Sequence, residues 1–152
     1  MTVITPVDVS EITRAVVSQL KADTRLAGVT ITRSEDENID PNNCPWVGVY
    51  RLAVQYPQRQ LVSAAGFRGQ QVQLLVLVTQ SDLGSGEACE DALEDLVKSV
   101  LSSLLSDCTL GSVVQFLDGF EVDYTRYTKS GQFYMQTAAI QFTAITNTTI
   151  GG

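Results

Sequence analysis

The sequence contains no histidine, which removes the side chain most often used as a general base, a transition-metal ligand or a pH switch. Its three cysteines, Cys44, Cys89 and Cys108, are too few and too far apart to indicate a disulfide framework or a Cys-x-x-Cys site. We interpret them as reduced thiols with structural roles in a cytosolic protein. A catalytic cysteine usually needs a histidine partner, so none of the three is expected to be a nucleophile.

Long apolar runs and positive charge are also scarce. The longest run of large apolar residues covers residues 74–78, whereas a membrane helix needs about 20 residues. Residues 1–6 have no basic region and no long apolar stretch, so no secretory signal is predicted. Lys and Arg total 10 against 17 Asp and Glu, a net charge of −7. This balance argues against a protein that grips nucleic acid, because such affinity comes from neutralising phosphates.

The common catalytic and ligand-binding motifs are missing too. There is no Walker-type phosphate loop, dinucleotide fingerprint or nucleophile elbow. Residues 36–42 begin like a calcium loop, but Pro41 stands where a glycine is required and Val47 where a glutamate is required. We therefore predict no catalytic residues, no metal and no cofactor, and we expect this segment to be a solvated acidic loop.

What the chain does contain is the composition of one globular domain. Its 152 residues are 44% apolar and 18% charged, and no linker or internal repeat divides residues 1–152. Two segments, 9–20 and 87–104, repeat apolar residues every three or four positions and predict amphipathic helices. The first turns of the second helix are rich in acids, which the helix dipole favours there.

The remaining apolar segments alternate or are β-branched and predict strands. They cover residues 29–33, 46–56, 70–80, 113–117, 120–127 and 133–146. Residues 74–78 are apolar on both faces, so we expect that strand in mid-sheet with cover on each side. Turns between neighbouring strands favour mostly antiparallel pairing. The predicted fold is α+β, in the order α-β-β-β-α-β-β, with two helices packed on one face of about five strands.

The helical periodicity also predicts which side chains form the core. On the helices these are Ile12, Val16, Leu20, Leu93, Leu96, Val100 and Leu104. On the strands they are Leu74, Val76, Val78, Ile140 and Phe142.

One segment differs in charge from the rest of the chain. Residues 41–81 contain Arg51, Arg59 and Arg68 and no acid, so they carry +3 while the remainder carries −10. Three arginines do not make a nucleic-acid-binding protein, but a basic strand pair on an acidic body suggests a directed protein contact.

The layout of nearly the whole chain resembles the tail terminator (tail completion) proteins of long-tailed bacteriophages. The likeness lies in the helix at residues 9–20, the step Asp23-Thr24-Arg25-Leu26 into a strand and the long hairpin 46–80. The acidic start of the second helix (87–104) and the closing hairpin 120–146 complete it. The resemblance implies a structural virion protein and not an enzyme. It implies a ring, of six copies, at the head-proximal end of the tail, built in the host cytoplasm.

The same resemblance implies the partners of the chain. The ring would cap the tail tube protein and join it to the head-tail connector proteins, with DNA only as passing cargo and no membrane contact. An acidic body suits a pore through which DNA slides without binding. Closed rings need two different patches on each subunit. We expect Arg51 on one patch and the acidic helix, through Glu90 and Glu94, on the other.

The connection 58–69 is the candidate tube-docking loop. It is long for a hairpin loop, and several of its residues are apolar without an obvious place in the core. The candidate contact residues are Arg59, Leu61, Val62, Phe67 and Arg68.

Two other interpretations stay open. One is a different virion part: another head-tail connector protein, a tube protein or a baseplate protein. The second is a small α+β ligand-binding domain or enzyme, which would need a pocket holding a carboxylate of shifted pKa.

Overall fold

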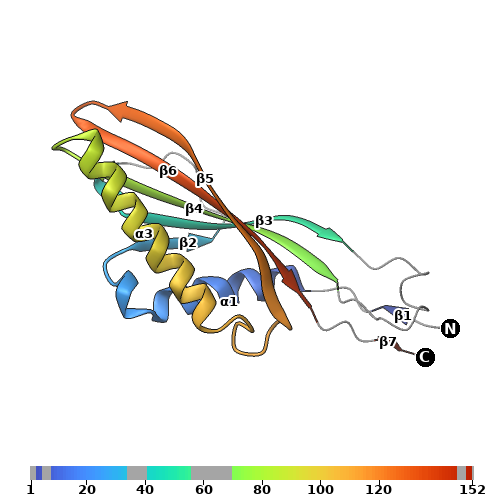
Figure 1. Ribbon diagram of the computed structural model, residues 1–152. Helices are drawn as coiled ribbons and strands as arrows, with labels where there is room; N and C mark the ends of the chain where they lie inside the picture. The colour runs from blue at the N-terminus through green and yellow to red at the C-terminus, as the bar shows by residue number, and fades with distance from the viewer. Residues whose placement is uncertain (1–2, 5–7, 34–40, 56–69, 147–149, 152) are drawn as a thin grey trace.

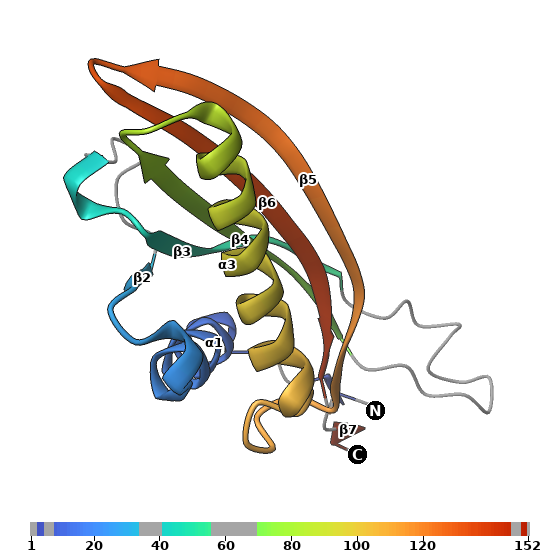
Figure 2. The same cartoon turned by 60° about the vertical axis from the view of Figure 1, so that its left-hand side comes forward.

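The computed structural model describes residues 3–4, 8–33, 41–55, 70–146 and 150–151, in which two helices lie on one face of a five-stranded sheet (Figures 1 and 2). The helices are α1 (Val9–Ala22) and α3 (Gly86–Ser106); the strands are β2 (Thr30–Arg33), β3 (Trp46–Gln55), β4 (Gln71–Asp82), β5 (Phe116–Ser130) and β6 (Phe133–Ile145). The strand order is β2-β3-β4-β6-β5, with β2 parallel to β3 and every other pair antiparallel. The predicted α+β class and the order of elements are confirmed.

Both helices begin where a short polar side chain can accept a backbone hydrogen bond. The amide of Glu11 donates to Asp8 Oδ1 over 3.1 Å at the start of α1. The amide of Ala88 donates to Ser85 Oγ over 3.1 Å at the start of α3. Both residues stand directly before the apolar periodicity begins, the position at which N-capping residues occur.

Strand β4 is the centre of the sheet, because it pairs along its length with β3 on one side and β6 on the other. Its alternate residues Val72, Leu74, Val76 and Val78 are completely buried under the helices. Leu75, on the opposite face, is only partly buried. The expectation that this strand is covered on each side is therefore wrong: apolar residues stand on both faces, but both helices cover the same one.

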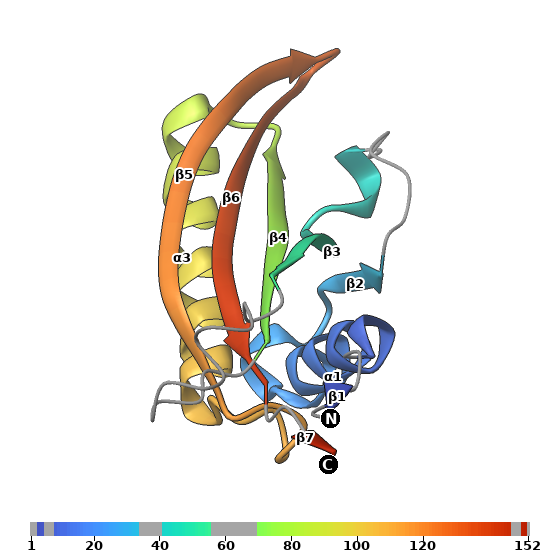
Figure 3. The ribbon, with the colours of Figure 1, turned by 90° about the vertical axis from the view of Figure 1, so that its right-hand side faces the viewer.

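Strand β5 is a single strand of 15 residues, where the sequence predicts two strands with a break at Asp118-Gly119. Gly119 has a φ of +68° and lies in an irregularity between Asp118 and Glu121, where the register with β6 shifts. A β-bulge of this kind bends a strand without ending it. The two residues that looked like a turn therefore lie within a strand, whose hairpin with β6 is visible at the edge of the sheet in Figure 3.

The predicted core is confirmed in full. All of its residues are buried and belong to one hydrophobic cluster between the helices and the sheet: Ile12, Val16, Leu20, Leu93, Leu96, Val100, Leu104, Leu74, Val76, Val78, Ile140 and Phe142. Phe142 also stacks on Phe120, with 5.0 Å between the ring centroids. This aromatic pair extends the cluster to the edge strand β5.

The ends of the chain meet in a pairing that the sequence analysis did not predict. Strand β1 (Val3–Ile4) pairs antiparallel with β7 (Ile150–Gly151), away from the main sheet (Figure 1). Two residues per strand carry too little periodicity for a sequence-based prediction.

The core assignment gives a direct test on one helix. Leu93 is fully buried, so Leu93→Ala is expected to lower the free energy of unfolding by about 2–5 kcal/mol. Leu105 on the same helix is 57% exposed, and Leu105→Ala should change that free energy by less than about 0.5 kcal/mol. Urea unfolding of both variants measures the contrast. Equal effects of the two substitutions would contradict the orientation of α3.

Candidate functional site

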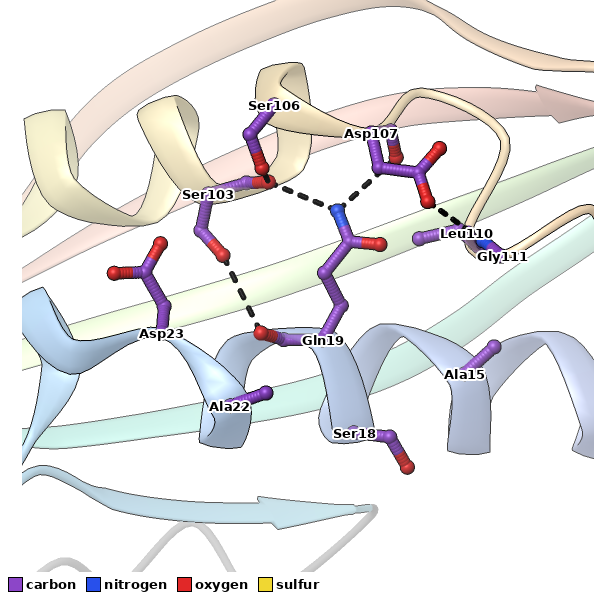
Figure 4. A pocket seen from close by; sticks show the side chains of 10 residues that line it. All are labelled: Ala15, Ser18, Gln19, Ala22, Asp23, Ser103, Ser106, Asp107, Leu110 and Gly111. Atoms are coloured by element: carbon purple, nitrogen blue, oxygen red, sulfur yellow. Dashed lines mark hydrogen bonds between the residues drawn. The ribbon is translucent and has the colours of Figure 1, made fainter.

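A shallow groove of about 630 Å³ runs between the C-terminal halves of α1 and α3 (Figure 4). Its lining residues come from α1, from α3 and from the turns that follow each helix: Ala15, Ser18, Gln19, Ala22, Asp23, Ser103, Ser106, Asp107, Leu110 and Gly111. It contains amide, hydroxyl and carboxylate groups, and is therefore the part of the described chain to examine first for binding or chemistry.

The side chain of Gln19 crosses the groove and caps the end of α3. Its Nε2 donates to the carbonyl oxygen of Ser103 over 2.8 Å and to that of Asp107 over 3.0 Å (Figure 4). Ser103 Oγ donates back to the carbonyl oxygen of Gln19 over 3.5 Å. The last carbonyls of a helix have no backbone partner within the helix. The Gln19 amide is a second donor to each oxygen, because Ser103 O also accepts from Ser106 Oγ and Asp107 O also accepts from the Leu110 amide.

Asp107 holds the turn that follows α3. Its carboxylate accepts from the Thr109 amide over 3.0 Å, from Thr109 Oγ1 over 2.5 Å and from the Gly111 amide over 2.9 Å. These hydrogen bonds, led by that of the Thr109 hydroxyl, lower the pKa of Asp107. The turn includes left-handed residues at Leu110, Gly111 and Ser112, and it places the Leu110 side chain in the core.

Asp23 is held by its neighbour Arg25 at the end of α1. Arg25 Nη2 donates to Asp23 Oδ2 over 2.6 Å, and its Nε and backbone amide donate to Oδ1 over 3.0 and 2.9 Å. The hydrogen bond from the Arg25 side chain is the main cause that holds the pKa of Asp23 far below its usual range. This geometry orders the three residues that lead from α1 toward β2.

The groove is therefore a helix junction whose polar groups already bind one another. A general base works best with a pKa near the working pH, whereas Asp23 and Asp107 both have lowered pKa values. No group of three Cys, Asp or Glu side chains that could hold a metal ion lies within the described residues. The contacts in the groove explain how α3 is fixed to α1, and they identify no reaction.

The cysteines take no part in the groove. None of the three forms a disulfide, and Cys89 is buried. Its Sγ donates to the carbonyl oxygens of Gln80 and Tyr134, each over 3.4 Å, and burial raises the pKa of its thiol. A raised thiol pKa makes Cys89 a weaker nucleophile, as expected of a packing residue.

The candidate subunit contacts that the structure describes lie on different parts of the molecule. Arg51 is exposed on β3, whereas Glu90 and Glu94 are exposed on α3. Glu94 Oε1 lies 3.4 Å from Lys98 Nζ, one helical turn away. Helix α3 packs against β4 and β6, which places this acidic part of α3 on the β5 side of the sheet (Figure 3). Burial and the Glu94 charge raise the pKa of Tyr124 on β5. Arg51 lies on the β3 side, so one subunit does not bring the two charges together.

The candidate tube-docking residues Arg59, Leu61, Val62, Phe67 and Arg68 lie outside the described residues, and their role stays a prediction. The sequence analysis missed another group of surface residues. Among the described residues the large exposed hydrophobic side chains are Leu52, Leu83, Leu105, Phe116 and Tyr124. For the three on strands, Leu52, Phe116 and Tyr124, periodicity does not identify them, because exposure at a sheet edge depends on which strand lies alongside.

Comparison with models of known protein families gives no match, and comparison with curated proteins gives none either. Among the described residues, no helix combines the length and apolar character needed to cross a membrane.

If Gln19 caps α3, its removal should destabilise the fold more than removal of the Ser18 side chain beside it. Gln19→Ala leaves the carbonyls of Ser103 and Asp107 without this donor, and should lower the free energy of unfolding by about 1–3 kcal/mol. Ser18→Ala, at an exposed position in the same groove, should change it by less than about 0.5 kcal/mol. Chemical denaturation compares the two variants, and a Gln19 effect no larger than the Ser18 effect would show that the cap is dispensable.

The Asp23–Arg25 pair predicts a pH dependence in acid. Because the pKa of Asp23 is lowered on folding, its carboxylate stabilises the fold above its unfolded pKa of about 3.9. This stabilisation is lost as the pH falls through the folded pKa. We expect Asp23→Asn to be less stable than the parent chain near neutral pH, and the gap to narrow below about pH 4. Unfolding at several pH values measures it, with Asp95→Asn on the exposed face of α3 as the control. A gap that stays constant with pH would contradict the assignment.

Proposed function

We propose that this chain is a structural virion protein that resembles a phage tail terminator. In this proposal copies of the chain form a ring, of six subunits, which caps the tail tube and joins it to the head-tail connector proteins. DNA passes through the ring without being bound. The chain acts through protein contacts and carries out no reaction.

The observation that carries the proposal is the arrangement of the whole domain. Two helices cover one face of a five-stranded, mostly antiparallel sheet, in the element order expected from the resemblance. The acidic part of α3 and the arginine of β3 lie on different sides of the domain, which suits the two unlike patches that a ring subunit needs. The polar groups of the groove are engaged in helix capping, and nothing in its contacts favours a catalytic alternative.

The decisive experiment adds the purified chain to the tail tube protein of the virus that encodes it, while tubes are assembling. We expect shorter tubes that carry the chain at one end only, as seen by electron microscopy with a tagged chain. Phe67→Ala, in the candidate docking loop, should weaken this capping. Arg14→Glu, at an exposed position on α1, is the control that should leave it unchanged.

The alternatives give different results in the same experiment. A tube protein would enter along the length of the tubes, and a baseplate protein would bind the opposite end. Tubes of unchanged length with no bound chain would overturn the proposal.

A further inference from the structure

The sheet has two sides on which described strands lack a neighbour. Strand β5 is the last strand of the sheet and pairs only with β6. On the other side β2 pairs with residues 46–49 of β3 and leaves residues 51–55 without a described strand beyond them. Unpaired strand edges present rows of backbone donors and acceptors that can pair with another chain.

Exposed apolar side chains gather on these same two strands. Leu52 on β3 is 48% exposed, and Phe116 and Tyr124 on β5 are 40% and 48% exposed. Three of the five large hydrophobic side chains that are exposed in the described residues therefore lie on the strands with open edges. Aromatic and aliphatic side chains at a strand edge provide the cross-strand contacts that stabilise strand pairing.

The charges of the two strands are opposite in sign. Residues 116–124 of β5 contain Asp118, Glu121 and Asp123 and no cation, and all three acids are exposed. The only charged residue of β3 is Arg51, also exposed. Like charges would oppose pairing of β5 with β5, whereas opposite charges favour pairing of β5 with β3. The charges thus select a contact between two different edges.

The positions and directions of β3 and β5 in the sheet also allow the two edges to pair in successive copies. Across the sheet Gln55 is paired with Gln71, which is paired with Ile145, which is paired with Phe116. Arg51 reaches Phe142 through Leu74 in the same way, next to the bulge between Asp118 and Glu121. Residues 51–55 and the first part of β5 therefore lie at one level of the sheet. Three successive antiparallel pairings make β5 run antiparallel to β3.

We propose that a second copy of this chain continues the sheet: residues 116–121 of β5 in one copy pair antiparallel with residues 51–55 of β3 in the next. Arg51 then lies close to Asp118 and Glu121 of the neighbour. The contact joins two unlike edges, so it is repeated from copy to copy. It rests on the proposed function for the closure of the repeat into a ring, but the strand pairing itself needs no tail tube.

The test uses two charge-reversal variants. Each should lose self-association when alone, and the two should associate when mixed. Arg51→Glu places an acid against the acidic β5 edge, and Glu121→Arg places a cation against Arg51. Each variant alone should self-associate more than about tenfold more weakly than the parent chain, measured by analytical ultracentrifugation at low salt. An equal mixture should associate again, because each variant offers the other a complementary edge at both contacts.

Two control reversals at exposed positions of α1, Arg14→Glu and Glu11→Arg, should leave self-association unchanged. Hydrogen exchange adds a readout of the pairing itself: amides in residues 51–55 and 116–121 should gain protection when the parent chain associates. The proposal is overturned if the parent chain stays monomeric, if the mixture fails to associate, or if these amides gain no protection. The self-association experiment contains no tail tube protein. If the chain self-associates as expected but does not cap tubes, the result contradicts the proposed function and leaves the strand pairing intact.

Discussion

The burial of one face of β4 is the constraint on which the rest of this structure depends. Four alternate side chains of this strand are inaccessible to water, and they are covered by α1 and α3 together with the inner residues of β3 and β6. A central strand pairs on both sides, so its position fixes its neighbours, and the helices must then follow the face that carries the larger apolar surface. Within the described residues, no helix covers the opposite face of the sheet.

A second constraint on the fold is the set of hydrogen bonds between α1 and α3. The ends of α1 and α3 meet where Gln19 donates to two carbonyl oxygens of the other helix and Asp107 holds the following turn. Buried apolar packing alone allows one helix to slide along another, whereas these hydrogen bonds have definite directions and distances. The groove between the helices is a consequence of this junction. Its amide and carboxylate side chains form hydrogen bonds with neighbouring groups of the same chain, so the groove does not identify a ligand.

The surface of the domain is uneven in a way that suits an assembly subunit. The β5 side carries acids and aromatic side chains, while the β3 side carries an arginine and a leucine. An exposed strand edge is a site at which another chain can pair. In the repeating contact that we propose, these two unlike edges of successive copies would complement each other.

The sequence by itself determined the helices and their buried faces, because helical periodicity is a local property of the chain. It also determined the α+β class, whereas the tail-terminator function remains a proposal. Only the tertiary structure decided that the apolar residues on the two faces of β4 are not equally buried, that β5 continues through its bulge, and that Gln19 caps a helix end 84 residues away. The reason is physical: strand neighbours, edge exposure and interhelical hydrogen bonds depend on residues distant in the chain, and no local pattern encodes which of them meet.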